Sequence, residues 1–292
     1  YEIKECDWSS DVCSSDLHRI LRTCQARNIQ CIPLRGPLLA VQLYGDDAIR
    51  QMDDLDLLVH YEDLSAIKEI FPQLGYAPHE HRSGFQETYS YSLEFYHPQH
   101  GVIVEPHWTL AYPPTTTGVA MGPVWARSER RRIQDIETTT LSHADLLLHL
   151  CLHLLHKGTQ TPLLWYYEVD RLIRRGGDSL NWNVVIAQAR EMGQAGLIAE
   201  VLTAIVHRFH SPVSESILKD QLASSAEMTA AFPRPMSEQM LTHSSLHGRE
   251  EFAVLCSLRG LRSKIRYAAA LLFPSPSYID RKSTRLNSSH IP

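Results

Sequence analysis

The strongest constraint on the fold of this chain is a pair of acids at the start of an apolar strand, within Arg50-Gln-Met-Asp-Asp-Leu-Asp-Leu-Leu-Val59. Side chains two residues apart in a strand point to the same face, so Asp54 and Asp56 project together while Leu55 and Leu57 face a core. The α-carbons of the two acids are expected to lie roughly 6.6–6.8 Å apart. Both carboxylates can then bind the same hard cations, such as Mg²⁺. Two acids on one strand are also typical of a solvated edge, so the assignment depends on the residues around them.

A glycine turn and an arginine give the acid pair its context. The segment Leu34-Arg35-Gly36-Pro37-Leu38-Leu39 joins a strand end to a helix start. Glycine lets the backbone approach a phosphate there, and the exposed N–H groups of a helix start favour anions. Arg50 precedes Asp54 by four residues and either reaches a triphosphate or braces the turn. An ordinary strand-to-helix turn is the alternative interpretation of the glycine segment.

A third acid follows about fifty residues later, in Val102-Ile-Val-Glu105-Pro-His107-Trp108. Glu105 ends a predicted hairpin strand, and it completes a triad with Asp54 and Asp56 if that strand pairs beside Leu55–Val59. Pro106 cannot donate to a strand ladder, which suits a strand end at the rim of a site. The alternative is a surface glutamate.

The distribution of apolar residues predicts an α+β fold with two lobes. Residues 18–135 mix strand alternation with helical periods, which indicates an α/β domain with a mixed sheet. Its strands are expected at Cys31–Leu34, Leu55–Val59, Thr88–Tyr96 and Gly101–Glu105, and its helices at His18–Ile29, Pro37–Leu43 and Glu62–Leu74. Residues 136–281 are helical in pattern and form the second, all-α domain, with Ser142 as the cap of its first helix and Asp145 in the capping-box position.

The two ends of the chain are interpreted as lying outside this fold. Residues 1–17 contain Ser9-Ser10-Asp11-Val12 followed by the near copy Ser14-Ser15-Asp16-Leu17, and residues 282–292 are polar and without a period. We therefore expect non-native or disordered segments at 1–17 and 282–292.

Composition narrows the partners and the compartment. A net charge of −5 argues against an extended nucleic-acid surface, and the basic run Arg127–Arg132 is expected to be a solvated connector. No stretch of the sequence approaches the length of an apolar membrane span. The cysteines within the predicted fold show no CxxC pairing and are expected to be buried thiols: Cys24, Cys31, Cys151 and Cys256. These features favour a cytoplasmic protein that does not enter a membrane.

Several motifs occur in a fixed order along residues 18–281. The first half contains Arg35-Gly36-x-x-Leu39, Tyr44-Gly45-Asp46, Arg50, Asp54-x-Asp56-Leu-Leu-Val59 and Val-Glu105-Pro-His107-Trp108. The second half contains Leu141-Ser-His-Ala-Asp-Leu-Leu-Leu-His149-Leu-Cys-Leu-His153, Leu164-Trp-Tyr-Tyr-Glu-Val-Asp170-Arg-Leu, Arg266-Tyr and Leu272-Phe-Pro-Ser275. This order resembles the uncharacterised nucleotidyltransferases of the DNA polymerase β superfamily.

The resemblance implies a fold, a reaction and a set of site residues. The first domain would be a polymerase-β-like nucleotidyltransferase domain that moves a nucleoside monophosphate from a nucleoside triphosphate to an acceptor hydroxyl or similar group, releasing pyrophosphate. Two ions, Mg²⁺ or Mn²⁺, would be held by the catalytic residues Asp54, Asp56 and Glu105, the last of which would assist deprotonation of the acceptor. The nucleotide would be bound by Arg35, Gly36 and Arg50. A small molecule, a peptide and an RNA end all stay open as acceptors.

Three departures from the superfamily pattern keep a second interpretation open. Pro37 stands where a serine usually holds the nucleotide phosphates, and it offers neither a hydroxyl nor an N–H. Arg35 replaces the usual lysine but keeps the charge and can fork across phosphate oxygens. Glu105 is one methylene longer than the commoner aspartate. The alternative is a catalytically degenerate member that binds a nucleotide or a partner protein.

One further group of residues could hold a metal. His149, His153 and His156 are spaced so that one helix face presents three imidazoles, which zinc would accept. Leucines flank these histidines on both sides, and no glutamate follows in a zinc-protease order. We therefore interpret them as core or inter-lobe histidines, one of which can meet the substrate if the lobes close over a cleft.

Overall fold

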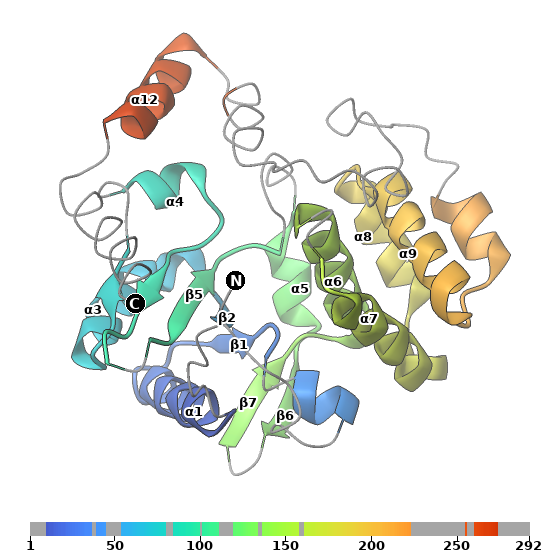
Figure 1. Ribbon diagram of the computed structural model, residues 1–292, viewed down its shortest axis with the longest axis horizontal. Helices are drawn as coiled ribbons and strands as arrows, with labels where there is room; N and C mark the ends of the chain where they lie inside the picture. The colour runs from blue at the N-terminus through green and yellow to red at the C-terminus, as the bar shows by residue number, and fades with distance from the viewer. Residues whose placement is uncertain are drawn as a thin grey trace, which may run out of the picture.

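The computed structural model describes residues 10–36, 39–44, 54–79, 84–99, 101–110, 119–133, 136–157, 161–222, 255 and 260–273. Among the predictions above, those for Pro37, Arg50 and Cys256 lie outside the described residues, and so do residues 1–9 and 282–292. Figure 1 shows the sheet with α1 and α3 on one side of the molecule and the helices α6–α9 on the other.

The first part of the chain is a mixed α/β unit, as the sequence pattern predicts. Its elements are α1 (Ser10–Ala26), β1 (Cys31–Pro33), the π-helix η1 (Ala40–Tyr44), β2 (Asp54–Val59), the 3-10 turn η2 (Tyr61–Asp63), α3 (Leu64–Gln73), β3 (Ala77–Pro78), α4 (Phe85–Tyr89), β4 (Phe95–Tyr96) and β5 (Ile103–His107). Gly75 takes a φ of +94° directly after α3, which is the left-handed conformation that commonly ends a helix.

The second part is a hairpin followed by helices. Its elements are α5 (Met121–Ala126), β6 (Glu129–Ile133), β7 (Ile136–Thr140), α6 (His143–Lys157), α7 (Leu163–Gly176), the 3-10 turn η4 (Gly177–Ser179), α8 (Trp182–Glu191), α9 (Ala195–Phe209), the π-helix η5 (Ile217–Leu222) and α12 (Leu261–Leu272). The α+β fold class is thereby confirmed, and helices α7, α8 and α9 lie in the part of the chain whose pattern predicts helices.

The central sheet has five strands in the order β1-β2-β5-β4-β3. Strands β2 and β5 are parallel, and the other neighbours are antiparallel. A parallel pair needs a long crossover connection, which here contains α3. In the register of this pair, Asp56 lies opposite Glu105 and Leu58 lies opposite His107. The predicted pairing of the Glu105 strand beside Leu55–Val59 is therefore confirmed.

Each face of the sheet is covered by a different apolar cluster. One face packs against α1 and α3 and contains Leu55, Leu57, Val59 and Val104 together with Leu17, Ile20, Ile67 and Phe71. The other face packs against the helices of the second part and contains Ile32, Leu34 and Leu58 together with Leu147, Leu150, Val169 and Leu202. The second cluster is continuous from the sheet into α6–α9, so the sheet and the helices share one core.

Helix α6 begins with the cap that the sequence predicts. Ser142 Oγ accepts a hydrogen bond from the Asp145 backbone N–H at 3.2 Å and donates to the Asp145 carboxylate at 2.5 Å. Arg127 adds two hydrogen bonds to the same carboxylate, at 2.7 and 3.0 Å. Arg127 therefore braces a buried helix start, whereas Arg130, Arg131 and Arg132 are exposed on β6.

The first helix begins earlier than the sequence analysis expects. Helix α1 begins at Ser10, so the expectation that residues 1–17 lack regular structure is wrong for residues 10–17. The physical reason is an apolar stripe at helical spacing that continues through this segment: Cys13, Leu17, Ile20, Leu21 and Cys24 are all buried.

One strand prediction also needs correction. Within the predicted strand Thr88–Tyr96, residues 88–89 end the short helix α4 and only Phe95–Tyr96 forms a strand, β4. Leu93 donates to the carbonyl of Pro106 at 2.9 Å, but Pro106 has no N–H to return the bond, so the ladder beside β5 is interrupted.

The sequence analysis does not predict the hairpin β6–β7, because the inward positions of its strands are polar. Thr138 and Thr140 are buried while Glu137 is exposed, so the alternation is present without an apolar pattern. The two strands pair across the predicted domain boundary between residues 135 and 136, and β7 packs against β1. The division into domains stays a prediction, and this hairpin links the two parts.

Candidate active site

The acids predicted from the sequence lie on the sheet face that meets the helical part. Alternation along β2 places Asp54, Asp56 and Leu58 on one face, and alternation along β5 places Glu105 and His107 there too. Asp56 and His107 are buried, while about a third of the Asp54 side chain and a quarter of the Glu105 side chain are exposed. The carboxylates therefore form a partly open group at the border between the sheet and α6.

Arg35 provides the positive charge of this group. The backbone N–H of Leu34 donates to the carbonyl of Asp56 at 2.9 Å, which extends the pairing of β1 with β2 to the residue before Arg35. The guanidinium then forms an ion pair with Asp56 Oδ2 and lies 3.7 Å from Asp54 Oδ2. Gly36 follows with a φ of +66°, the left-handed conformation that lets the chain turn directly after Arg35.

His107 engages the other oxygen of Asp56. The distance from His107 Nε2 to Asp56 Oδ1 is 3.1 Å, and the distance from the same nitrogen to Glu105 Oε2 is 3.8 Å. Within the described part of the chain, Asp56, Glu105 and His107 form a group whose ligand atoms all lie within 4.8 Å of one another. Asp54 lies outside this group, on the side of Arg35.

The three carboxyl groups have different pKa values in the metal-free protein. Burial and the neighbouring Asp56 raise the pKa of Asp54. Burial alone would raise the pKa of Asp56, but Arg35 and the hydrogen bond from His107 outweigh it and hold this pKa well below its usual range. Burial, followed by the charges of Asp56 and Asp54, raises the pKa of Glu105 to about 8. Asp56 is thus the most acidic of the three carboxyl groups.

Helices α6 and α7 complete the site from the opposite side. Arg35 Nη1 donates to His153 Nε2 at 2.5 Å, and its guanidinium carbon lies 5.6 Å from the ring centroid of Trp165. Burial and the charge of Arg35 hold the pKa of His153 well below its usual range, so this imidazole is neutral and accepts the hydrogen bond. Burial likewise lowers the pKa of His149 to about 3 and that of His156 to about 4.

His149 and His153 are therefore buried residues, which agrees with the interpretation of the α6 histidines as core or inter-lobe residues. His149 and His153 are buried against the sheet, and His156 Nε2 lies 3.3 Å from the hydroxyl of Tyr91. Among the described residues, the group that could hold a metal ion contains His107, and it contains none of the three α6 histidines. His153 nonetheless meets the site through its contact with Arg35.

The structure brings most predicted site residues together. Asp54, Asp56, Glu105 and Arg35 converge, Gly36 forms the adjoining turn, and Arg50 lies outside the described residues. Sequence reasoning gave no role to His107, although its position two residues after Glu105 on the same strand places both side chains on one face. It also missed Trp165, because nothing in the sequence indicates which helix covers Arg35.

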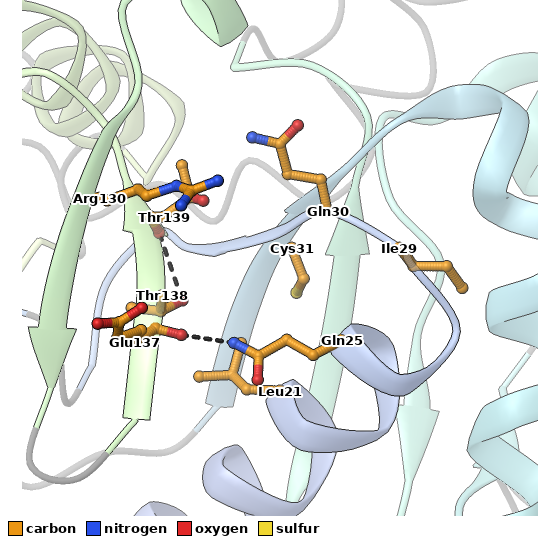
Figure 2. A pocket seen from close by; sticks show the side chains of 9 residues that line it. All are labelled: Leu21, Gln25, Ile29, Gln30, Cys31, Arg130, Glu137, Thr138 and Thr139. Carbon is orange, nitrogen blue, oxygen red and sulfur yellow. Dashed lines mark hydrogen bonds between the residues drawn. The ribbon is translucent and has the colours of Figure 1, made fainter.

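A separate cavity lies away from these acids. It has a volume of about 190 Å³ and is bounded by α1, β1 and the β6–β7 hairpin (Figure 2). Gln25 reaches across it and donates to the carbonyl of Glu137 at 2.5 Å. None of the predicted site residues lines this cavity, so it is not part of the acid group.

The donor set of the acid group fits a divalent metal ion. Carboxylate oxygens suit Mg²⁺ and Mn²⁺, and a buried imidazole nitrogen is a further ligand type for Mn²⁺. The low pKa of Asp56 means that this carboxylate is ionised at neutral pH and able to bind a cation. The residues present therefore fit the divalent ion that the sequence resemblance implies.

A parallel strand pair that carries two acids on one strand opposite a third on the next, beside a glycine turn with a basic residue, is the arrangement of a nucleotidyltransferase. The family described as uncharacterised nucleotidyltransferase matches residues 9–210, which is more than half of the chain, and the protein belongs to this family. The protein is therefore a transferase of nucleoside monophosphate groups. No curated protein matches the chain.

Solved structures with some similarity to this chain have low sequence identity. The solution structure of the antibiotic-resistance factor ANT(2'')-Ia is 14% identical with a TM-score of 0.45, over 69% of this chain and 98% of that one. A crystal structure of ANT(2'')-Ia in complex with adenylyl-2''-tobramycin is 16% identical with a TM-score of 0.41, over 60% and 93%. An antigenic nucleotidyltransferase-like protein from Paracoccidioides brasiliensis is 16% identical with a TM-score of 0.44, over 73% and 95%.

The helices of the described residues are too short or too polar to cross a bilayer.

Proposed function

We propose that this protein is a metal-dependent nucleotidyltransferase that moves a nucleoside monophosphate from a nucleoside triphosphate to an acceptor hydroxyl or similar group. The acceptor oxygen forms a bond to the α-phosphorus, and the bond from that phosphorus to the bridging oxygen of the leaving group breaks. Pyrophosphate leaves, and the proton of the acceptor passes to a carboxylate of the site. The observation that carries this proposal is the register of β2 and β5, which sets Asp56 opposite Glu105.

The three acids divide the work by position. Asp54 and Asp56 share one strand face and would hold the metal ions. Glu105 lies on the neighbouring strand beside Asp56, where it would act as the third ligand and would assist deprotonation of the acceptor. With two divalent ions bound, Mg²⁺ or Mn²⁺, these residues would place positive charge beside the α-phosphate and the attacking and leaving oxygens.

Arg35 and Gly36 serve the nucleotide phosphates. The guanidinium of Arg35 already lies at the acids, and its fork of donors matches phosphate oxygens. Gly36 has no side chain to keep a phosphate from the backbone. Arg50 is assigned to the triphosphate by its place in the sequence motif.

The acceptor is a small molecule, a peptide or an RNA end, and the protein works in the cytoplasm. Buried thiols without disulfide partners at Cys24, Cys31 and Cys151 support a reducing compartment. The net charge of −5 disfavours a long nucleic acid as acceptor, because such a partner needs a broad basic surface.

The test is transfer of α-³²P label from each of the four nucleoside triphosphates into small molecules, protein and RNA of a cell extract, with Mg²⁺ or Mn²⁺ present. We expect metal-dependent label in one fraction and its loss in the Asp54→Ala/Asp56→Ala double variant. Asp178→Ala is the matched control, since this acid is exposed on η4 and outside the site.

The labelled fraction identifies the acceptor class. Label that persists in a double variant shown to be folded by circular dichroism would contradict the assignment of the acids. No label in any fraction from the folded parent protein would favour the degenerate, nucleotide-binding or partner-binding interpretation.

A further inference from the structure

The two oxygens of Asp56 face different partners. Oδ2 is paired with the guanidinium of Arg35, which also lies 3.7 Å from Asp54. Oδ1 faces the opposite way, towards His107 at 3.1 Å and the neighbouring Glu105. Because Arg35 neutralises the Asp54 side of the site, the positions around Oδ1 are the ones at which a metal ion meets no competing guanidinium.

The atoms around Oδ1 are already close to the spacing of ligands on one ion. Bonds of about 2.1 Å from a metal to nitrogen or oxygen place neighbouring ligand atoms about 3 Å apart. The distance from His107 Nε2 to Asp56 Oδ1 has this value, and Glu105 Oε2 lies 3.8 Å from the same nitrogen. A small rotation of the partly exposed Glu105 side chain closes the set.

His107 is held in this orientation by its surroundings. It is 2% exposed, it ends β5 directly after Pro106, and its ring lies 5.3 Å from that of Tyr91. A buried imidazole with little freedom loses little entropy when it binds an ion. The nitrogen that faces the two carboxylates is therefore preorganised for a ligand role.

We propose that His107 is a metal ligand, and that Asp56, Glu105 and His107 hold one ion of the proposed transferase with a preference for Mn²⁺ over Mg²⁺. This inference rests on the proposed function, which supplies the need for a divalent ion at Asp56. Imidazole is a good ligand for first-row transition ions, whereas Mg²⁺ favours oxygen ligands and water. His107 thus determines which metal the site takes.

A second role for His107 sets the alternative outcome of the test. In this alternative role, His107 does not bind the metal ion. Its Nε2–H donates a hydrogen bond to Asp56 and orients this carboxylate, as histidines and carboxylates do around many metal sites. Glutamine at position 107 keeps a donor for Asp56 and removes the imidazole nitrogen. The variant His107→Gln therefore separates a ligand from an orienting hydrogen-bond donor.

The first measurement is made on the full-length protein with Mn²⁺ alone, in the absence of nucleotide. Electron spin-echo envelope modulation of bound Mn²⁺ is expected to show coupling to an imidazole ¹⁴N nucleus, with one ion bound per chain. The coupling is expected to vanish in His107→Gln and to persist in His153→Gln, which removes the neighbouring imidazole on α6. Bound Mn²⁺ without ¹⁴N coupling in the parent protein would overturn the proposal, whether or not any variant folds.

The second measurement is the affinity for Mn²⁺ and for Mg²⁺ by isothermal titration calorimetry. We expect the parent protein to bind Mn²⁺ about tenfold or more tightly than Mg²⁺, and His107→Gln to lose about tenfold in Mn²⁺ affinity with little change for Mg²⁺. Equal losses for both ions would identify an orienting role and contradict the ligand assignment.

These outcomes are distinguishable from failure of the proposed function. Binding of Mn²⁺ with ¹⁴N coupling but without label transfer would support the metal site and contradict the transferase proposal. Label transfer with Mg²⁺ but without ¹⁴N coupling would support the transferase proposal and contradict the ligand role of His107.

Discussion

Strands β2 and β5 present apolar side chains on one face, and ionisable side chains together with Leu58 on the other. Towards α1 and α3 lie Leu55, Leu57 and Val104, all buried in one apolar cluster. Towards α6 lie Asp56, Glu105 and His107, one residue further along the same strands. The comparison separates two contributions to the protein, because residues one position apart serve stability on one face and chemistry on the other.

The two faces also differ in how the burial of their side chains changes the free energy of folding. Each fully buried leucine stabilises the fold by roughly 1.5–3 kcal/mol relative to an exposed one. Removing a carboxylate such as Asp56 from water is unfavourable unless partners compensate, and here the charge of Arg35 and a hydrogen bond with His107 do so. The apolar face therefore stabilises the fold, and the role proposed for the polar face is catalysis.

The largest effect is expected for Asp56→Asn, which removes the most acidic carboxylate of the site while keeping its shape. Loss of a shared metal ligand should lower the rate of label transfer by about 10³-fold or more, since metal ions supply several kcal/mol of transition-state stabilisation. Single-turnover transfer at saturating metal measures this effect, with Asp178→Asn as control. If the variant kept a tenth of the parent rate of label transfer, this result would contradict a catalytic role for Asp56.

The opposite face is tested by Leu57→Ala, one residue along β2. Leu57 is 1% exposed, so the cavity left by the truncation should cost about 3 kcal/mol of unfolding free energy. Transfer per folded molecule should stay within about twofold of the parent rate, because the side chain points away from the acids. Urea unfolding followed by tryptophan fluorescence gives the first quantity. A large loss of transfer at unchanged stability would break the separation of the two faces.

Arg35→Met tests how the charge on the polar face is compensated. Asp56 would remain buried without its guanidinium partner, which should cost about 3 kcal/mol of unfolding free energy in metal-free protein. Added Mn²⁺ should restore part of this loss, because an ion supplies the missing positive charge. The matched control is Arg131→Met on exposed β6, whose ion pair with Glu129 should contribute little. No destabilisation in Arg35→Met would contradict the compensation.

A fourth test uses pH to probe α6 where it covers the polar face. Burial lowers the pKa of His149 to about 3 in the folded protein, against about 6.5 in the unfolded chain. The unfolded state therefore binds more protons between these values, so stability falls as the pH drops below about 6.5. The expected loss from His149 between pH 7 and pH 5 is about 2 kcal/mol. His149→Gln should show a correspondingly shallower decline in urea unfolding, and an unchanged decline would reject a neutral, buried His149.

The smallest effect is expected at the beginning of the same helix. Ser142→Ala removes the side-chain acceptor for the N–H of Asp145 and should cost about 1 kcal/mol of unfolding free energy. Thermal unfolding measures it, and Ser142→Thr, which keeps a hydroxyl, should recover most of the loss. Transfer per folded molecule should not change, since Arg127 still holds Asp145. A selective loss of transfer would show that this cap also positions the site.

Sequence patterns predicted the parts of the molecule that depend on local periodicity. Alternation along β2 placed Asp54 and Asp56 on one face, and the serine and aspartate spacing placed the start of α6. The strand pairing of Glu105 followed from a family motif and is confirmed by the register. The approach of Trp165 and His153 to Arg35 could not be predicted, because it depends on how distant elements pack. The β6–β7 hairpin was missed because threonines fill its inward positions.

The apolar cluster that continues from the sheet into α6–α9 determines how enzyme activity is lost when the protein is heated. Both walls of the site belong to this one cluster, with Leu58 on the sheet side and Leu150 on the helix side. The walls cannot separate while the core stays intact, so no folded but inactive species should accumulate. Thermal inactivation and global unfolding are then a single cooperative event with a common midpoint.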